Sequence, residues 1–429
     1  MFSKRDSEED SFGHLNANKA SMGQLITGPI EITGFAQNYA WGKRGRDSLV
    51  AELINQTSTD LPFAELWYGS HPNGSSDLII NSKSIGFRAT LEEHAEELLG
   101  DSLRKKYGDT LPFLFKILSV GGALSIQLHP TKEQAANLNK QKPDLYKDDN
   151  HKPEIAIALT PITMFYGFRP FTELAANLES TPELRHLISE SLISDFLNSK
   201  SEESARVALK ELYRELMCST LSEHGRNKLN IACAELVSRC NSSIEGSSEN
   251  ALVAHLAKSY PVDVGLFAPY LMNIITVPVG EAVYTEPCVP HAYLSGDMVE
   301  VMANSDNVVR AGLTPKTCDV ETLTSIIDCR MGLPDLVRPS GLGSAEFKRY
   351  VTAAKEFEVQ VLQSSVEVSN ITKNKPELLF PLNCKGSIKW GEDASIEFQK
   401  GRAVLIPSFL GKYSVQLDEG SLYRVIVPS

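Results

Sequence analysis

Long apolar runs are missing from the 429-residue sequence. No stretch reaches the roughly 18 apolar residues that a membrane-spanning helix needs, so we expect no membrane association. Its seven cysteines are scattered and form no Cys-x-x-Cys pair, so we expect neither a zinc–thiolate site nor a disulfide framework. The N-terminal residues lack the apolar core of a signal peptide. Reduced thiols and a cytoplasmic protein are therefore predicted.

Basic residues are also scarce relative to acidic ones. The sequence has 42 Lys and Arg against 54 Asp and Glu, a formal net charge of -12. Nucleic-acid binding needs clustered cations that neutralise phosphates, so this balance argues against a nucleic-acid partner. It does not argue against an anionic small molecule, because two or three cations can form a local pocket in an acidic protein.

The distribution of apolar residues indicates several structural regions. Residues 1–27 are polar and patternless, and we predict a flexible tail. Short strand-like runs fill 28–168, 263–335 and 336–429, whereas 169–262 has helical periodicity. We predict a mainly β protein with an α-helical insertion. Two cupin-like antiparallel β-barrels are expected, the first built from 28–168 and 263–335 and the second from 336–429.

The helical periodicity of 169–262 is clearest near its middle. Leu209, Leu212, Tyr213 and Leu216 are spaced i, i+3, i+4 and i+7, which places them on one face of a helix. This segment is therefore predicted to be an inserted helical domain.

Two strand-like segments carry polar residues on one face. Residues 124–129 alternate, so Ser125, Gln127 and His129 point to the side opposite the apolar residues. In 154–159, Glu154 shares a face with the small residues Ala156 and Ala158. Polar side chains beside small ones leave room for a ligand, although a solvated face is the commoner explanation of such a pattern.

The histidines suggest a candidate metal site. Gln127 and His129 lie two apart on one strand face, Glu154 begins another strand, and His291 follows a turn-like segment. Two imidazoles, a carboxylate and an amide oxygen suit zinc or another first-row divalent ion. Spacing alone, however, favours ordinary buried histidines. No histidine follows His291, so the C-terminal barrel cannot supply a histidine-based site.

Two cations near the end of the first region are candidates to bind an anion. Arg310 and Lys316 follow a run of polar residues, and arginine offers phosphate a two-pronged donor. The alternative is a structural ion pair with Glu300 or Asp306. The local sequence leaves both explanations open.

Several segments together resemble the type I mannose-6-phosphate isomerases. The match is specific from about residue 30 to 335 and weaker over the C-terminal ninety or so residues. The segments that carry it are Asn38–Gly42 (NYAWG), Ala64–Pro72 (AELWYGSHP), Leu111–Lys116 (LPFLFK), Ser125–Pro130 (SIQLHP), Asp149–Glu154 (DNHKPE), Gly167–Pro170 (GFRP) and Val289–Lys316.

The resemblance implies a cupin-type fold with an inserted helical domain and one zinc ion per chain. The residues that match the family's zinc ligands are Gln127, His129, Glu154 and His291, and Arg310 matches a residue assigned to its active site. The pair Gly121-Gly122 departs from the bulkier residues expected in relatives, and we expect it to reshape a turn.

The implied reaction interconverts mannose 6-phosphate and fructose 6-phosphate by proton transfer through a cis-enediol. It needs a base, for which His151, Lys152, Glu300 and Tyr293 are candidates. It also needs cations or hydroxyls that hold the phosphate, for which the candidates are Ser125, Lys116, Arg310 and Lys316.

Two other functions remain as alternatives at this point. A cupin-fold metal dioxygenase is one, although such enzymes usually use iron and more histidine ligands than this set offers. The other is a non-catalytic sugar-phosphate-binding protein. In either case we expect a small-molecule ligand and a monomeric protein.

Overall fold

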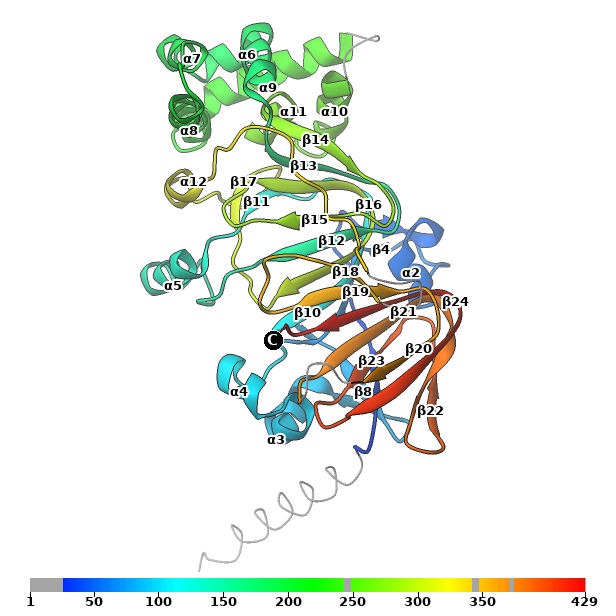
Figure 1. Ribbon diagram of the computed structural model, residues 1–429. Coiled ribbons are helices and arrows are strands. Elements are labelled where there is room, and N and C mark those ends of the chain that lie inside the picture. Colours follow the sequence, from blue (N-terminus) through cyan, green and yellow to red (C-terminus); the bar gives the residue numbers. More distant parts are fainter. Residues whose placement is uncertain (1–25, 243–247, 342–346, 370–373, 429) are drawn as a thin grey trace, which may run out of the picture.

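The computed structural model describes residues 26–242, 248–341, 347–369 and 374–428. The predicted tail, residues 1–27, lies almost entirely outside these ranges. Two ten-stranded antiparallel sheets and a group of helices make up the described chain (Figure 1). None of the helices in these ranges combines the length and apolar character that a membrane crossing requires.

The first sheet contains the strands expected to carry the site. Its main order is β14-β13-β16-β10-β5-β2, and four shorter strands pair with this path. The strands are β2 (Phe35–Gln37), β5 (Glu65–Tyr68), β10 (Phe113–Val120), β11 (Ile126–Leu128), β12 (Glu154–Ala158), β13 (Ile162–Phe168), β14 (Met272–Val277), β15 (Ala282–Thr285), β16 (His291–Ala303) and β17 (Val309–Gly312).

The second sheet has the order β18-β19-β24-β21-β23-β1-β8-β9. Its strands are β1 (Ile30–Thr33), β8 (Asp77–Ile80), β9 (Lys83–Gly86), β18 (Lys348–Tyr350), β19 (Glu358–Leu362), β20 (Val366–Ser369), β21 (Glu377–Trp390), β22 (Ala394–Glu397), β23 (Arg402–Ile406) and β24 (Lys412–Ile426). Two small ribbons pair β3 (Lys43–Arg44) with β4 (Pro62–Phe63), and β6 (Ser70–His71) with β7 (Gly74–Ser75).

The prediction of a mainly antiparallel β protein with a helical insertion is confirmed. In detail the sheets are open, because neither hydrogen-bonded path returns to its first strand. The chain also crosses between them: β1, β8 and β9 precede residue 168 but pair within the second sheet. The second sheet therefore combines strands from the predicted second region, 336–429, with three strands from the N-terminal part.

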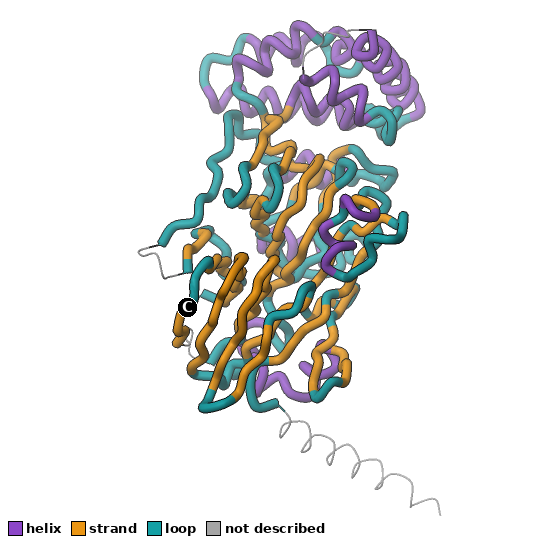
Figure 2. The backbone as a smooth tube through the Cα atoms, turned by 90° about the vertical axis from the view of Figure 1, so that its right-hand side faces the viewer, coloured by secondary structure: helices purple, strands orange, loops and turns teal. Residues whose placement is uncertain are grey.

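The helices of the insertion gather at one end of the molecule, beyond the first sheet (Figures 1 and 2). The apolar face predicted from Leu209 to Leu216 lies on α8 and is buried, and a Ser201–Ser204 capping box begins this helix. The helices of the insertion are α6 (Phe171–Ser180), α7 (Glu190–Leu197), α8 (Glu202–Cys218), α9 (Glu223–Ser242) and α10 (Ser248–Leu256). The remaining helices are α2 (Leu49–Leu53), α3 (Phe87–Leu99), α4 (Asp101–Tyr107), α5 (Lys132–Gln141), α11 (Ala268–Leu271) and α12 (Val320–Ile326).

Strand alternation in the first sheet separates a core from a cavity. On β10, Phe115 and Ile117 belong to an apolar core shared with the second sheet, where the Phe115 ring lies 5.0 Å from that of Phe380. Leu114, Lys116 and Leu118 point to the opposite face and line a cavity. The second sheet thus supports the back of the strands whose front carries the candidate site.

Candidate active site and metal centre

The polar faces of five strands of the first sheet meet around a cavity of about 480 Å³. Strands β5, β10, β11, β16 and β17 contribute to its lining, as do the loops that follow β16 and β17. Eight of the residues singled out from sequence line it, namely Lys116, Ser125, Gln127, Lys152, Tyr293, Glu300, Arg310 and Lys316.

Strand register brings two distant parts of the sequence to Gln127. On β11 this residue pairs with His291 of β16 and with Arg310 of β17. Antiparallel neighbours across a ladder have side chains about 5 Å apart at Cβ. The sheet therefore brings a candidate metal ligand and the candidate anion-binding arginine to the same strand.

His129, Glu154 and His291 converge in the interior beside Gln127. One ligand atom from each lies within 4.8 Å of the others, and all three residues are buried. Nε2 of His129 is 3.5 Å from Oε2 of Glu154, and Nε2 of His291 is 3.1 Å from Oε1. The structure thus brings together three of the four predicted ligands and places the fourth, Gln127, next to His291 in the ladder.

The other nitrogen of each imidazole is held by the backbone. Nδ1 of His129 is 2.9 Å from the carbonyl oxygen of Asn307, and Nδ1 of His291 is 3.0 Å from that of Val289. A carbonyl oxygen only accepts, so each Nδ1 must carry the proton. The lone pair of each Nε2 is consequently left to face Glu154, which is the arrangement metal-binding histidines use.

Four polar atoms in this cluster have no hydrogen-bond partner. They are Nε2 of His129, Nε2 of His291 and both carboxylate oxygens of Glu154. Buried polar atoms are seldom left unpaired, because desolvation without a partner costs about 1–3 kcal/mol per group. Four such atoms that face one another fit a divalent cation, whose N/O ligands would satisfy them together.

Electrostatics favour the forms that bind a metal. Burial lowers the pKa of His129 to about 4, and the nearby charge of Lys152 acts in the same direction. Burial alone would raise the pKa of Glu154, but Lys152 and His129 hold it well below its usual range. Neutral imidazole and ionised carboxylate are the ligand states that a metal requires.

A second group of charges occupies the β5–β10–β16 side of the cavity. Nζ of Lys116 is 2.9 Å from Oε2 of Glu300 and 3.6 Å from Oε2 of Glu65, and it lies over the ring of Trp67. Although burial opposes it, attraction to these carboxylates raises the pKa of Lys116. Burial raises the pKa of Glu300, with Lys116 acting against it and Glu154 in the same direction.

Arg310 and Lys316 behave differently from Lys116. Within the described part of the chain neither side chain makes an ion pair or a hydrogen bond, and burial lowers the pKa of Arg310. The alternative, a structural ion pair of Arg310 or Lys316 with Glu300 or Asp306, is not found among these described residues. Glu300 instead contacts Lys116, and Asp306 contacts His71. These cations are therefore available to an anion in the cavity.

His151 is the one candidate base that does not line the cavity. Its Nε2 lies 2.9 Å from Oε1 of Glu356, in the loop before β19 of the second region. Because that contact joins residues 205 positions apart, local sequence gave no sign of it. The pair links the two regions, and the geometry does not place His151 where it would reach a bound substrate.

Sequence reasoning also missed residues that line the cavity. Glu65 and Trp67 on β5, His71 on β6 and Asp306 after β16 all contribute. A signal for the first two was present: Glu65 and Trp67 alternate with Leu66 and Tyr68, which enter the shared core. Gly121 and Gly122 both donate a backbone N–H to the carbonyl of Trp41, another lining residue, so the glycine pair does form a turn beside the cavity.

Comparison with known proteins agrees with this geometry. The family description "Phosphomannose isomerase type I, catalytic domain" matches residues 30–171, and the family's helical insertion domain matches 185–272. Mannose-6-phosphate isomerase from Rattus norvegicus is 44% identical over 68% of this chain and 71% of its own length. The Cryptococcus neoformans protein of the same name is 35% identical over 88% of this chain and 94% of its own.

Solved structures extend the similarity to the fold. A mannose 6-phosphate isomerase crystallised with zinc and yttrium superposes with a TM-score of 0.80 at 28% identity, covering 94% of this chain and 100% of the other. A mutant phosphomannose isomerase from Salmonella typhimurium gives a TM-score of 0.81 at 27% identity, covering 94% and 100%. Neither the dioxygenase nor the non-catalytic alternative is supported by these relatives. The chain belongs to the type I phosphomannose isomerase family.

Proposed function

We propose that this chain is a zinc-dependent isomerase that interconverts mannose 6-phosphate and fructose 6-phosphate. The observation that carries the proposal is the group of four unpaired polar atoms on His129, Glu154 and His291, next to a cavity with two unpaired cations. The relatives bear the name of this activity, and two similar structures contain zinc.

The metal would be held by Nε2 of His129, Nε2 of His291, the carboxylate of Glu154 and the amide oxygen of Gln127. When bound, zinc supplies a Lewis acid that stabilises negative charge developing on substrate oxygens, worth several kcal/mol. The protein holds both imidazoles as the neutral Nδ1–H tautomer, and it buries His129, Glu154 and His291 away from bulk water.

The charges around the cavity suit a phosphate dianion. Lys116, Lys152, Arg310 and Lys316 are balanced by Glu65, Glu154, Glu300 and Asp306. A divalent ion therefore leaves an excess of two positive charges. We place the phosphate at Arg310 and Lys316, with Ser125 as a further donor, because Lys116 is already enclosed by two carboxylates.

Proton transfer between C1 and C2 needs one group that takes and returns the proton on the same face. We assign this role to Glu300, because it lines the cavity and burial raises its pKa above the ordinary value of a carboxyl. Tyr293 is less suited, since burial raises its pKa well above 10. Lys152, 3.6 Å from Oε2 of Glu154, is placed to stabilise the negative charge of a cis-enediolate.

Metal analysis with a coupled assay for fructose 6-phosphate tests the proposal. We expect about one zinc per chain, turnover of mannose 6-phosphate, loss of both after chelation, and recovery of both when zinc is restored. A purified protein that binds no divalent metal, or that turns the substrate over at full rate after complete chelation, would refute it.

We further propose a cytoplasmic location. All seven cysteines are free thiols, which suits a reducing compartment. Fractionation of cells that express the chain tests this, and recovery in an oxidising compartment would contradict it.

A further inference from the structure

The loop between β16 and β17 contacts both the metal cluster and the substrate cavity. It contains Asn304, Ser305, Asp306 and Asn307, which we call the 304–307 loop. The carbonyl of Asn307 accepts from Nδ1 of His129. Because β16 supplies His291 and β17 supplies Arg310, a short loop between the two strands sets the position of His129 as well.

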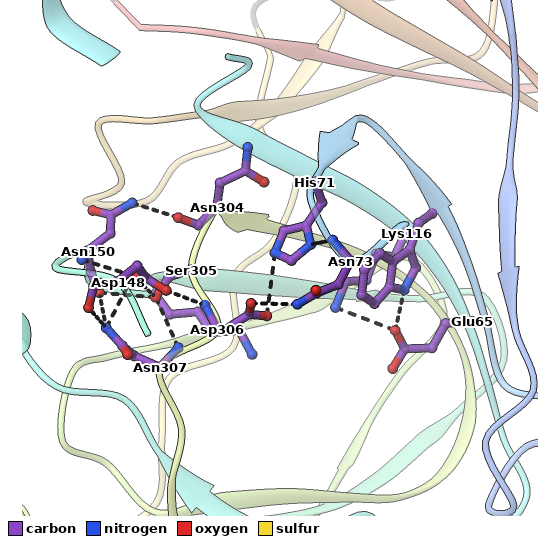
Figure 3. A network of polar contacts seen from close by, with 12 residues as sticks. Glu65, His71, Asn73, Lys116, Asp148, Asn150, Asn304, Ser305, Asp306 and Asn307 are labelled. Carbon is purple, nitrogen blue, oxygen red and sulfur yellow. Dashed lines mark hydrogen bonds and ion pairs between the residues drawn. The ribbon is translucent and has the colours of Figure 1, made fainter. Parts of the chain in front are cut away.

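The carboxylate of Asp148 accepts hydrogen bonds from three residues of this loop, as Figure 3 shows. Its Oδ1 accepts from the hydroxyl of Ser305 at 2.8 Å and from Nδ2 of Asn307 at 3.2 Å. Its Oδ2 accepts from the backbone N–H of Asp306 at 2.8 Å. The backbone N–H of Asn150 provides a fourth donor at 2.9 Å.

Asn307 links the Asp148 carboxylate to the metal cluster. The residue is fully buried. Its side-chain amide donates to the carbonyls of Asp148 and Asn150, at 2.8 and 2.9 Å, and its N–H donates to Ser305 at 3.1 Å. These bonds hold Asn307 in place, and its carbonyl oxygen lies 2.9 Å from Nδ1 of His129.

The far side of the loop is fixed at the substrate cavity. The carboxylate of Asp306 accepts from Nδ2 of Asn73 at 2.8 Å and lies 3.4 Å from Nε2 of His71 (Figure 3). The loop is thus held on Asp148 and on the β6–β7 ribbon, and its first residue, Asn304, also donates to the backbone carbonyls of Leu111 and Pro112.

We propose that Asp148 is a positioning residue for the metal ligand His129, acting through the carbonyl of Asn307. It fixes the Nδ1–H tautomer and the ring direction of His129 and so increases zinc affinity without touching the metal. The inference rests on the proposed function. A carboxylate suits the role because it only accepts, and its two oxygens meet four donors here.

Asp148→Asn is the sharpest test. Asparagine keeps the size but gives one acceptor oxygen and one NH₂ group, which would face the N–H of Asp306 or the donors at Oδ1. Loss of a partner that orients a metal ligand typically weakens metal binding 10–100-fold. For this more remote residue we expect about 10-fold weaker zinc binding, measured by chelator competition. The matched control is Asp149→Asn, which removes the same charge from the exposed neighbour and should bind zinc like wild type.

A readout that needs no metal separates positioning from general destabilisation. In metal-free protein, ¹⁵N chemical shifts of the His129 ring should report the Nδ1–H tautomer in wild type and in Asp149→Asn, and a mixed tautomer in Asp148→Asn. If Asp148→Asn folds poorly, Ser305→Ala offers a milder change, since it removes the hydroxyl that bridges Asp148 and the N–H of Asn307. We expect it to shift the tautomer in the same direction.

Zinc affinity within twofold of wild type in folded Asp148→Asn would overturn the proposal, as would an unchanged His129 tautomer in both Asp148→Asn and Ser305→Ala. An equal loss of affinity in Asp149→Asn would also overturn it, because general charge would then be the cause. Wild-type protein that fails to bind zinc would count against the proposed function instead, and the tautomer measurement would still decide the role of Asp148.

Discussion

Each sheet buries a carboxylate, Glu377 in the second and Glu154 in the first, and the two differ in their hydrogen bonds. In the second sheet, Glu377 accepts from Nε and Nη2 of Arg424 at 2.8 and 2.7 Å and from the hydroxyl of Tyr413 at 2.6 Å. Oε1 of Gln360 accepts from Nη1 of Arg424 at 3.1 Å. In the first sheet, neither oxygen of Glu154 has a hydrogen-bond partner within the described chain, although Nζ of Lys152 lies 3.6 Å from Oε2. The Nε2 atoms of His129 and His291 also lack hydrogen-bond partners among the described residues.

The difference separates a structural network from a binding site. In the described part of 336–429, no buried side-chain polar atom lacks a hydrogen-bond partner. Unpaired atoms elsewhere also include isolated ones, such as Nε2 of His94 and the hydroxyl of Thr181. An unpaired buried atom is therefore a weak sign of function by itself. A group of them that share one point in space is a strong one.

Glu154→Gln should give the largest effect, because it removes the only carboxylate of the metal cluster. We expect zinc to be lost and kcat to fall about 10³-fold, which corresponds to about 4 kcal/mol of transition-state stabilisation. Metal-free Glu154→Gln should unfold at a temperature no higher than metal-free wild type, because the substitution removes the attraction between Glu154 and Lys152. Metal content, the coupled assay and calorimetry measure these. Retained zinc with full turnover would exclude Glu154 as a ligand.

Arg424→Met should give the reverse pattern. It leaves Glu377 charged and without its main partner in the interior, which costs about 3–5 kcal/mol of unfolding free energy. Zinc content and kcat, measured below the unfolding temperature, should stay near wild type because the network lies in the other sheet. Denaturant unfolding provides the stability. A fall in zinc affinity with unchanged stability would show that the two regions are not separable in this way.

Arg310→Ala should reduce kcat/KM by about 10²-fold while zinc remains bound, because the arginine lines the cavity without belonging to the cluster. Arg310→Lys, which keeps a charge but loses the two-pronged donor, should recover part of the loss. Steady-state kinetics with metal analysis measure both. Full turnover in the alanine variant would remove Arg310 from the active site.

The smallest effect is expected from the double variant Arg424→Met with Glu377→Gln. No charge is then buried unpaired, and the glutamine oxygen still accepts from Tyr413, so stability should return to within about 1–3 kcal/mol of wild type. A double-mutant cycle from denaturant unfolding gives the coupling. A double variant less stable than Arg424→Met alone would mean that Glu377 stabilises the sheet by other contacts.

Local sequence predicted those features of the fold and site that depend on periodicity. The alternation in 124–129 indicated a strand with a polar face, and the structure contains a shorter strand there, β11 (Ile126–Leu128). The spacing of Leu209 to Leu216 indicated a helix, which is α8. Periodicity could not predict that His129, Glu154 and His291 converge, because their convergence depends on the register of β11, β12 and β16, which span more than 160 residues of sequence. Resemblance to a family supplied that step.

Other features depend on contacts between regions, which no local pattern encodes. The second sheet includes β1 and β8 from the N-terminal part because Ile32 and Leu78 pack in one core with Phe380 and Leu405. β9 joins the sheet by pairing with β8. His151 was a candidate base because it lies close to Glu154 in the sequence. In the structure it contacts Glu356 and does not line the cavity. Asp306 was considered only as a partner for Arg310, whereas it contacts His71.

The central claim is that His129, Glu154, His291 and Gln127 hold one metal ion beside the substrate cavity. An anomalous-scattering map recorded at the zinc edge from crystals of the native protein tests it most directly. We predict a single strong peak about 2.0–2.2 Å from Nε2 of both histidines and from oxygens of Glu154 and Gln127. A map with no peak there, or with its only peak at another site, would contradict the account.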